Sequence, residues 1–301
     1  MHESVLLKEC IEYLNIKNDS IMVDCTLGYG GHSSEILKRI NKGYLFAFDQ
    51  DADAINYSKK RLDNIANNYE IIKNNFVNIK NELQKRNVTV DGILYDLGVS
   101  SPQLDEEERG FSFHNNALLD MRMDKSKNFK ASDVVNEYSE NELISILYKY
   151  GEEKYAKSIA RGIVSNRPIN TTLQLVDIIK DNVPEKYKRD KHPARKTFQA
   201  IRIEVNDELN VFRKSLKDSL DLLNINGRIC VITFHSLEDK ICKEIFKEVT
   251  SVKSELKSMP VIPEKYLPKY KVVKVLKPTK EEIEKNKRAR SAKLRVIERI
   301  R

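Results

Sequence analysis

Short apolar runs alternate with helical patterns over the first third of the chain. Apolar side chains at helical spacing, such as Ile36, Leu37 and Ile40, separate the strand-like runs, which lie at 20–25, 44–48, 69–74 and 91–97. Strands that alternate with helices at short spacing are typical of a parallel α/β sheet. The pattern therefore predicts an open, mostly parallel sheet with helices packed on its faces.

The pattern changes to helical periodicity over 104–195, as in the segments 140–148 and 173–179. No strand-like run of comparable quality interrupts this stretch, and the fifth run, 227–234, follows only after it. We therefore predict an α/β domain formed by residues 1–103 and 196–301, with an all-helical domain of residues 104–195 inserted between its fourth and fifth strands.

The remainder of the chain predicts a closing hairpin. A helix over 204–220 is expected to end at Asn226-Gly227, where glycine stops a helix. After a proline-containing loop at 251–269, strand-like runs at 271–276 and 293–298 predict an antiparallel pair, which a plain dinucleotide-binding sheet does not need.

A glycine turn follows the first strand. The apolar run ends at Gly28, Gly30 and Gly31, a helical pattern begins, and the second run ends at Asp49. A strand, a glycine turn, a helix and an acid after the next strand are typical of binding to an adenosine-containing cofactor, whose ribose hydroxyls the acid accepts. A dinucleotide fingerprint wants a third glycine where Ser33 stands, so S-adenosylmethionine (AdoMet) is favoured over NAD. A purely connecting turn is the alternative interpretation.

The loop after the fourth strand carries candidate chemistry. Its core, Ser100-Ser-Pro-Gln103, resembles the Pro-containing loop of amino-methyltransferases, in which acceptors on a rigid turn hold an exocyclic amine toward the methyl group. Ser100, Ser101 and Pro102 are the catalytic candidates. A simple turn is the alternative.

Two other groupings are disfavoured. Phe234-His-Ser-Leu-Glu-Asp239 places a histidine, a serine and two acids after the fifth strand, but a hydrolytic triad does not arise from adjacency and the chain has no Gly-x-Ser-x-Gly elbow. His32, His192 and His235 lack the spacing of a zinc site, so no metal is expected.

Charge indicates a polyanionic partner. The net charge is +8, and two basic clusters contain Lys186, Lys188, Arg189, Lys191, Arg195 and Lys196, and Lys287, Arg288, Arg290, Lys293, Arg295, Arg299 and Arg301, the latter opposed by Glu298 alone. Clustered cations gain affinity for nucleic acid by releasing phosphate counterions, and Tyr187 and Phe198 would stack on bases. A solvated charged surface is the alternative for either cluster.

Other classes of protein are disfavoured. No apolar run is long enough to cross a bilayer, and the opening residues lack the basic region of a signal peptide, so no membrane association is expected. Cys10, Cys25, Cys230 and Cys242 form no CxxC pair and are typical of reduced thiols in a cytoplasmic protein. The oligomeric state is left open, a homo-oligomer included.

Taken together, the motifs resemble the MraW/RsmH family from one end of the chain to the other and in the same order. The resemblance rests on His2-x-x-Val-Leu-Leu7, Asp24-x-Thr-x-Gly-x-Gly-Gly-His-Ser33, Asp91-Gly-Ile-Leu-x-Asp-Leu-Gly-Val-Ser-Ser-Pro-Gln-Leu-Asp105, Arg109-Gly-Phe-Ser-Phe113, Leu119-Asp-Met-Arg-Met-Asp124, Tyr150-Gly-Glu-Glu153, His192-Pro-Ala-x-x-Thr-Phe-Gln-Ala-x-Arg202, Phe234-His-Ser-Leu-Glu-Asp239 and Arg288-Ala-Arg-Ser291.

This resemblance implies a class I AdoMet-dependent methyltransferase, with a Rossmann-like sheet and a C-terminal antiparallel hairpin. It implies methylation of N4 of a decoding-site cytidine in 16S rRNA of the small ribosomal subunit, and an inserted domain that recognises substrate. The cofactor-binding residues would be Gly30, Gly31, His32, Asp49, Phe76, Asp96 and Gln103, and the RNA-binding candidates are Lys191, Arg195 and Lys196. Another nucleic acid or a protein as methyl acceptor, and a non-catalytic ribosome-assembly factor, stay open as alternatives.

Overall fold

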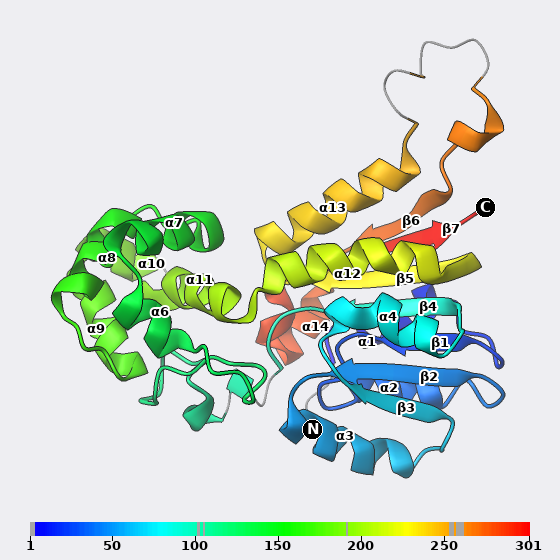
Figure 1. The fold of residues 1–301 in the computed structure, drawn as a ribbon, viewed down its shortest axis with the longest axis horizontal. Coiled ribbons are helices and arrows are strands. Elements are labelled where there is room, and N and C mark those ends of the chain that lie inside the picture. Colours follow the sequence, from blue (N-terminus) through cyan, green and yellow to red (C-terminus); the bar gives the residue numbers. More distant parts are fainter. Residues whose placement is uncertain (1–3, 101–102, 105, 191, 253–255, 257–261) are drawn as a thin grey trace. The chain divides into compact units, whose positions relative to one another are not determined.

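The computed structural model describes residues 4–100, 103, 104, 106–190, 192–252, 256 and 262–301. These residues form two compact units (Figure 1). The sheet unit contains Met1–Gly98 and Leu209–Arg301, and the helical unit contains Val99–Glu208. The helical unit therefore begins five positions before and ends thirteen positions after the inserted domain expected from the sequence, because the helix Ala194–Asn206 is continuous and belongs to it entirely.

Seven strands form the sheet in the order β3-β2-β1-β4-β5-β7-β6. The strands are β1 Ile21–Asp24, β2 Tyr44–Asp49, β3 Tyr69–Lys73, β4 Val90–Asp96, β5 Leu223–Thr233, β6 Tyr270–Leu276 and β7 Lys293–Arg299. The first five pair in parallel, whereas β7 is antiparallel to both β5 and β6. The expected parallel sheet with a closing antiparallel hairpin is thus confirmed, including all seven strands.

Helices cover the sheet unit. They are α1 Leu7–Tyr13, α2 Gly31–Leu37, α3 Ala52–Asp63, α4 Ile79–Lys85, α12 Glu208–Leu222, α13 Ser236–Thr250 and α14 Lys280–Lys285, with short 3-10 turns at Phe76–Asn78, Glu264–Tyr266 and Lys287–Ser291. Among the described residues, no helix has both the length and the apolar character needed to cross a bilayer.

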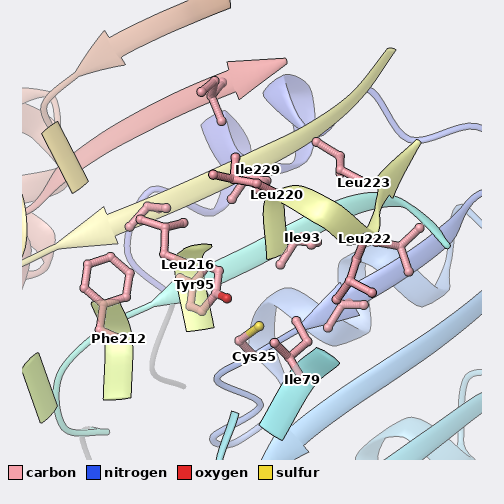
Figure 2. Close-up of a cluster of buried hydrophobic side chains, with 14 of the residues drawn as sticks. Cys25, Ile79, Ile93, Tyr95, Phe212, Leu216, Leu220, Leu222, Leu223 and Ile229 are labelled. Atoms are coloured by element: carbon pink, nitrogen blue, oxygen red, sulfur yellow. The ribbon is translucent and has the colours of Figure 1, made fainter. Parts of the chain in front are cut away.

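Alternate side chains of the strands enter two separate cores, one on each face of the sheet. Met22 belongs to one buried cluster and Val23 to the other, as the two-residue period of a strand requires. Figure 2 shows the cluster that contains Val23, in which Tyr95 of β4 lies near Phe212 and Leu216 of α12. The Tyr95 hydroxyl lies 2.7 Å from Ser215 Oγ and 2.6 Å from Ser219 Oγ, so this buried hydroxyl is paired.

The expected helix end at Asn226-Gly227 is wrong. Helix α12 ends at Leu222, and β5 begins at Leu223, so both residues lie inside the strand. Asn226 has a φ of 67°, and the register between β4 and β5 shifts in this part of the pair. Asparagine and glycine here mark an irregularity of the strand, which uses the same backbone conformations as a helix stop.

The helical unit contains α6 Ala131–Glu137, α7 Glu140–Gly151, α8 Ala156–Ser165, α9 Thr172–Asp181, α10 Glu185–Asp190 and α11 Ala194–Asn206, with a 3-10 turn at Glu107–Arg109. Two helix starts carry capping boxes, in which Ser139 and Thr171 accept backbone N–H bonds from Glu142 and Gln174. The only bridge of β type outside the sheet in the described chain joins Leu118 and Thr171, so the expected helical character is confirmed.

Candidate active site

The glycine turn connects β1 to α2 as expected from the sequence. Gly28 and Gly30 have φ values of 49° and 73°, and Gly30 is the N-cap of α2. A Cβ placed on Gly31 would lie only 2.0 Å from Ser4 Oγ. The turn therefore brings the backbone of residues 28–31 close to its neighbours, and glycine at position 31 leaves the space that Ser4 occupies.

Asp49 fixes this turn from the end of β2. Its Oδ2 accepts the N–H of Gly28 at 2.8 Å, and its Oδ1 accepts the N–H of Asp51 at 2.9 Å. Burial raises the pKa of Asp49 to about 6, although these backbone hydrogen bonds act in the opposite direction. Asp49 thus has a structural role that the sequence pattern did not indicate, in addition to the ribose role predicted for it.

A side-chain hydrogen bond between Asp24 and Ser33 joins β1 to α2. Ser33 Oγ donates to Asp24 Oδ2 at 2.7 Å, and the other carboxylate oxygen accepts the N–H of Thr26 at 3.0 Å. Both side chains are fully buried, and burial raises the pKa of Asp24. Ser33, which stands where a dinucleotide fingerprint has glycine, therefore fills that space with a hydrogen bond to the strand.

His32 and Asp96 come together at the ends of α2 and β4. His32 Nδ1 lies 3.6 Å from Asp96 Oδ2, and the Asp96 N–H donates to Thr26 Oγ1 at 2.7 Å. Burial lowers the pKa of His32 to about 4, so the ring is neutral at pH 7. Although 24% of the Asp96 side chain is exposed, its Oδ1 is buried, and burial together with the Asp24 and Glu238 carboxylates raises the pKa of Asp96 to about 8.

Phe76 lies just after β3, as expected, in the 3-10 turn Phe76–Asn78. Its ring meets the Tyr95 ring edge-on, with centroids 5.7 Å apart, and the side chain is only partly buried. The core thus holds one side of the ring while part of its surface stays accessible.

The loop after β4 is described only in part. Ser100 and Gln103 hydrogen-bond to each other, the Ser100 N–H donating to Gln103 Oε1 at 3.1 Å. Both belong to the helical unit, so their predicted roles beside the glycine turn remain predictions. Ser101 and Pro102 lie outside the described residues.

The basic cluster at 186–196 is partly neutralised. Lys188 pairs with Glu185 at 2.5 Å, and Lys196 Nζ donates to the Glu152 carbonyl at 2.6 Å, whereas Lys186, Arg189 and Arg195 are exposed. Lys191 lies outside the described residues.

The aromatic residues beside this cluster already have partners within the fold. Phe198 is only 3% exposed and packs edge-on against Phe113, so the expectation that it stacks on bases is wrong. Tyr187 donates its hydroxyl to Glu153 Oε2 at 2.6 Å and is covered on a second side by Lys154 Nζ, 5.0 Å from the ring centroid.

The second basic cluster also has more acidic partners than the sequence suggested. Asp239 of α13 pairs with Lys293 and Arg295 at 2.7 Å each, whereas Glu298 pairs with Arg228 and Lys271, which lie outside the cluster. Much of the charge on β7 is therefore used within the fold.

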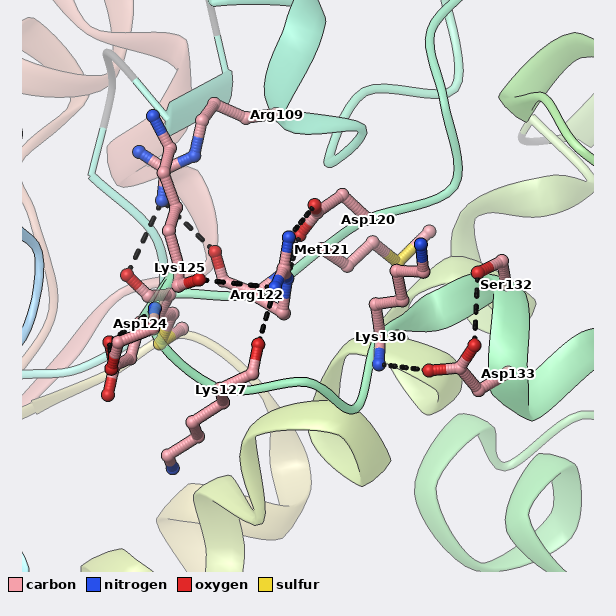
Figure 3. A network of polar contacts seen from close by, with 12 residues as sticks. Arg109, Asp120, Met121, Arg122, Asp124, Lys125, Lys127, Lys130, Ser132 and Asp133 are labelled. Carbon is pink, nitrogen blue, oxygen red and sulfur yellow. Dashed lines mark hydrogen bonds and ion pairs between the residues drawn. The ribbon is translucent and has the colours of Figure 1, made fainter.

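The motifs around Arg109 and Asp120 form a polar network inside the helical unit (Figure 3). Arg109 Nη2 donates to the Arg122 carbonyl at 3.0 Å, and Arg122 forms two hydrogen bonds to the Asp120 carboxylate and donates to the Lys127 carbonyl. A cavity of about 390 Å³ beside it is lined by Glu106, Glu107, Glu108, Arg109, Asp120 and Lys125. Because carboxylates predominate there, this cavity is a poor place for a phosphate group.

Comparison with known proteins gives full-length matches. The model of the MraW methylase family matches residues 1–300. The chain is 52% identical over 306 residues to the ribosomal RNA small subunit methyltransferase H of Exiguobacterium sibiricum, and 55% identical over 304 residues to that of Mycoplasma mycoides. Each alignment covers 99% of this chain and 98% of the relative.

Proposed function

The chain belongs to the MraW methylase family, and from this membership and the geometry of the glycine turn we propose that it transfers a methyl group from AdoMet to N4 of a decoding-site cytidine in 16S rRNA. The relatives described above are named as methyltransferases of small-subunit ribosomal RNA, which supports the class of substrate. The net charge of +8 is consistent with a polyanionic partner.

One observation carries the choice of cofactor. Asp24, Asp49 and Asp96 stand at the ends of three adjacent parallel strands, and burial raises the pKa of each. An anionic pyrophosphate beside these groups would raise their pKa values further, whereas a nearby cation would lower them and favour the ionised carboxylates. AdoMet is an adenosine cofactor that carries a sulfonium cation in place of phosphate.

The polar groups at this edge also fit a ligand. Among the described residues, His32 Nε2 and Asp96 Oδ1 are buried and have no hydrogen-bond partner. A buried polar atom without a partner costs about 1–3 kcal/mol, which a polar ligand would recover. Asp49 would hold the ribose hydroxyls, Gly30, Gly31 and His32 the amino-acid tail, and Phe76 the adenine, with Asp96 and Gln103 completing the pocket.

When bound, AdoMet supplies an electrophilic methyl group. The protein has to orient a weakly nucleophilic amine, whose lone pair is delocalised into the ring, and to exclude water. We assign the first task to Ser100, Ser101 and Pro102, which would accept the amine N–H groups, and RNA binding to Lys191, Arg195 and Lys196 of the helical unit.

A methyl-transfer assay tests this function. Labelled AdoMet is offered with small subunits, and separately with naked small-subunit rRNA, from cells that lack this protein, and the product nucleosides are identified by mass spectrometry. We expect N4-methylcytidine from at least one substrate. AdoMet binding without incorporation into either substrate would refute the proposal in favour of another acceptor or of a non-catalytic assembly role.

A further inference from the structure

The segment between β5 and α13 carries the motif Phe234-His-Ser-Leu-Glu-Asp239, which the proposed cofactor pocket does not use. Strand β5 lies directly beside β4, with Ile232 opposite Asp96, and the Leu97 N–H donates to the Ile232 carbonyl at 3.1 Å. A Cβ placed on Gly98 would lie 3.6 Å from Phe234 Cδ2. The segment therefore shares the sheet edge with Asp96 and packs against the start of the loop that leads to Ser100.

His235 lies at the start of α13 with both ring nitrogens buried. It is the N-cap of α13 and faces Glu238 in a capping-box arrangement, in which the Glu238 carboxylate accepts the His235 N–H, but no hydrogen bond from a backbone N–H to the imidazole is found among the described residues. The side chain is 11% exposed, and apart from the contact of Nε2 with the Glu238 carboxylate neither ring nitrogen has a hydrogen-bond partner among the described residues. Such burial costs free energy in the protein alone, so a partner that arrives with the substrate is the simpler explanation.

Glu238 holds this histidine in place. Its Oε2 accepts the N–H of Phe234 at 2.7 Å and that of His235 at 3.3 Å, while its Oε1 lies 3.1 Å from His235 Nε2. The carboxylate is 3% exposed. The imidazole thus has a fixed anionic neighbour at Nε2, whereas Nδ1 has no hydrogen-bond partner among the described residues.

Carboxylates stand on the sheet edge that this segment shares. Asp24 and Asp96 stand on the adjoining strand ends, and Glu238 contributes to the raised pKa of Asp96. The nearby cations Lys293 and Arg295 of β7 are both paired with Asp239, which also anchors the first turn of α13.

We propose that His235 accepts the proton that the target amine releases on methylation, and that Glu238 is the positioning residue for its ring. This inference rests on the proposed function. The lone pair of N4 forms the new N–C bond while the C–S bond breaks with its electron pair left on sulfur. An N4–H bond then returns its electron pair to nitrogen, and the proton passes to Nδ1 of His235 and later to water.

The test compares His235→Gln, Glu238→Gln and a control, Lys240→Gln, which changes an exposed residue of the same helix. Single-turnover methylation of saturating small subunits is measured from pH 5.5 to 9, and AdoMet affinity is measured by calorimetry. We expect His235→Gln to lower the rate constant about 100-fold, within the range of general base catalysis, with AdoMet affinity changed less than about twofold. The acid limb of the rate profile should disappear.

Glu238→Gln should lose less activity and move the acid limb to lower pH, because the protonated ring loses its anionic neighbour. Two results would overturn the role of His235 but leave the proposed function standing. One is a rate for His235→Gln within about threefold of the Lys240→Gln control, and the other is a loss of AdoMet affinity equal to the loss of rate. A wild-type protein that binds AdoMet without making N4-methylcytidine would overturn the proposed function, and this inference with it.

Discussion

Replacing Asp49 by asparagine tests the glycine turn most directly. Both carboxylate oxygens accept backbone N–H groups, from Gly28 at 2.8 Å and from Asp51 at 2.9 Å. An amide of the same shape keeps one acceptor oxygen and turns an NH₂ group toward the other donor. The loss of one hydrogen bond to a charged group corresponds to about 1.5–3 kcal/mol. If the turn and the ribose hydroxyls share this carboxylate, AdoMet affinity should fall about 10- to 150-fold.

The measurement is titration calorimetry of AdoMet at pH 7.5, with thermal unfolding recorded in parallel. Asp63→Asn, which removes an exposed carboxylate of α3, is the matched control and should leave the affinity within about twofold. We expect methylation to fall with AdoMet affinity in Asp49→Asn. A folded Asp49→Asn protein that binds AdoMet normally would remove the ribose assignment, whatever its stability.

Further predictions concern pH, the glycine turn and the core. Because the folded pKa of Asp49, about 6, lies above that of an ordinary carboxyl, its contribution to the free energy of unfolding decreases as pH rises from about 4 to about 6. Hydroxyl donors need the ionised form, so AdoMet affinity should fall about tenfold per unit below pH 6 and lose this dependence in Asp49→Asn; a flat wild-type profile would contradict the assignment. Gly31→Ala should reduce stability in urea by about 1–3 kcal/mol, and adding Ser4→Ala should restore part of it, because the new Cβ meets Ser4 Oγ at 2.0 Å; an unchanged midpoint in Gly31→Ala would refute the contact. Tyr95→Phe removes the hydroxyl that pairs with Ser215 and Ser219, of which Ser215 keeps its bond to the Phe76 carbonyl, and should lower the melting temperature at unchanged AdoMet affinity; a loss of affinity would show that the core reaches the site.

The strands could be predicted from the sequence because each is a short apolar run that ends at a polar or glycine residue. The end of α12 could not, since Asn226-Gly227 provides a positive φ that suits a helix stop and a strand irregularity equally. The burial of Phe198 was readable in principle. Ala194, Phe198, Ile201 and Val205 recur at helical spacing, which indicates the core face of a helix more strongly than a base-stacking surface.

The candidate site was predictable where chemistry depends on one residue at the end of one strand. Asp49 and Asp96 lie at the ends of β2 and β4, and Gly30 lies in the turn after β1, because parallel strands align their carboxyl ends. Contacts between side chains far apart in sequence were not predictable. The bond from Ser33 to Asp24 and the pairing of Asp239 with Arg295 depend on the register of helix and strand, which residue types alone do not specify.

The position of the helical unit within the chain also bears on the order of folding. Strands β4 and β5 are neighbours in the sheet, although the whole helical unit separates them in sequence, and β7 then pairs between β5 and β6. During synthesis, β1 to β4 can pair early. The other edge of β4 stays unpaired until the helical unit and β5 have been synthesised. Such non-local pairing slows folding and leaves an edge open to wrong partners. Rapid independent collapse of the helical unit would shorten that exposure by bringing the ends of β4 and β5 together.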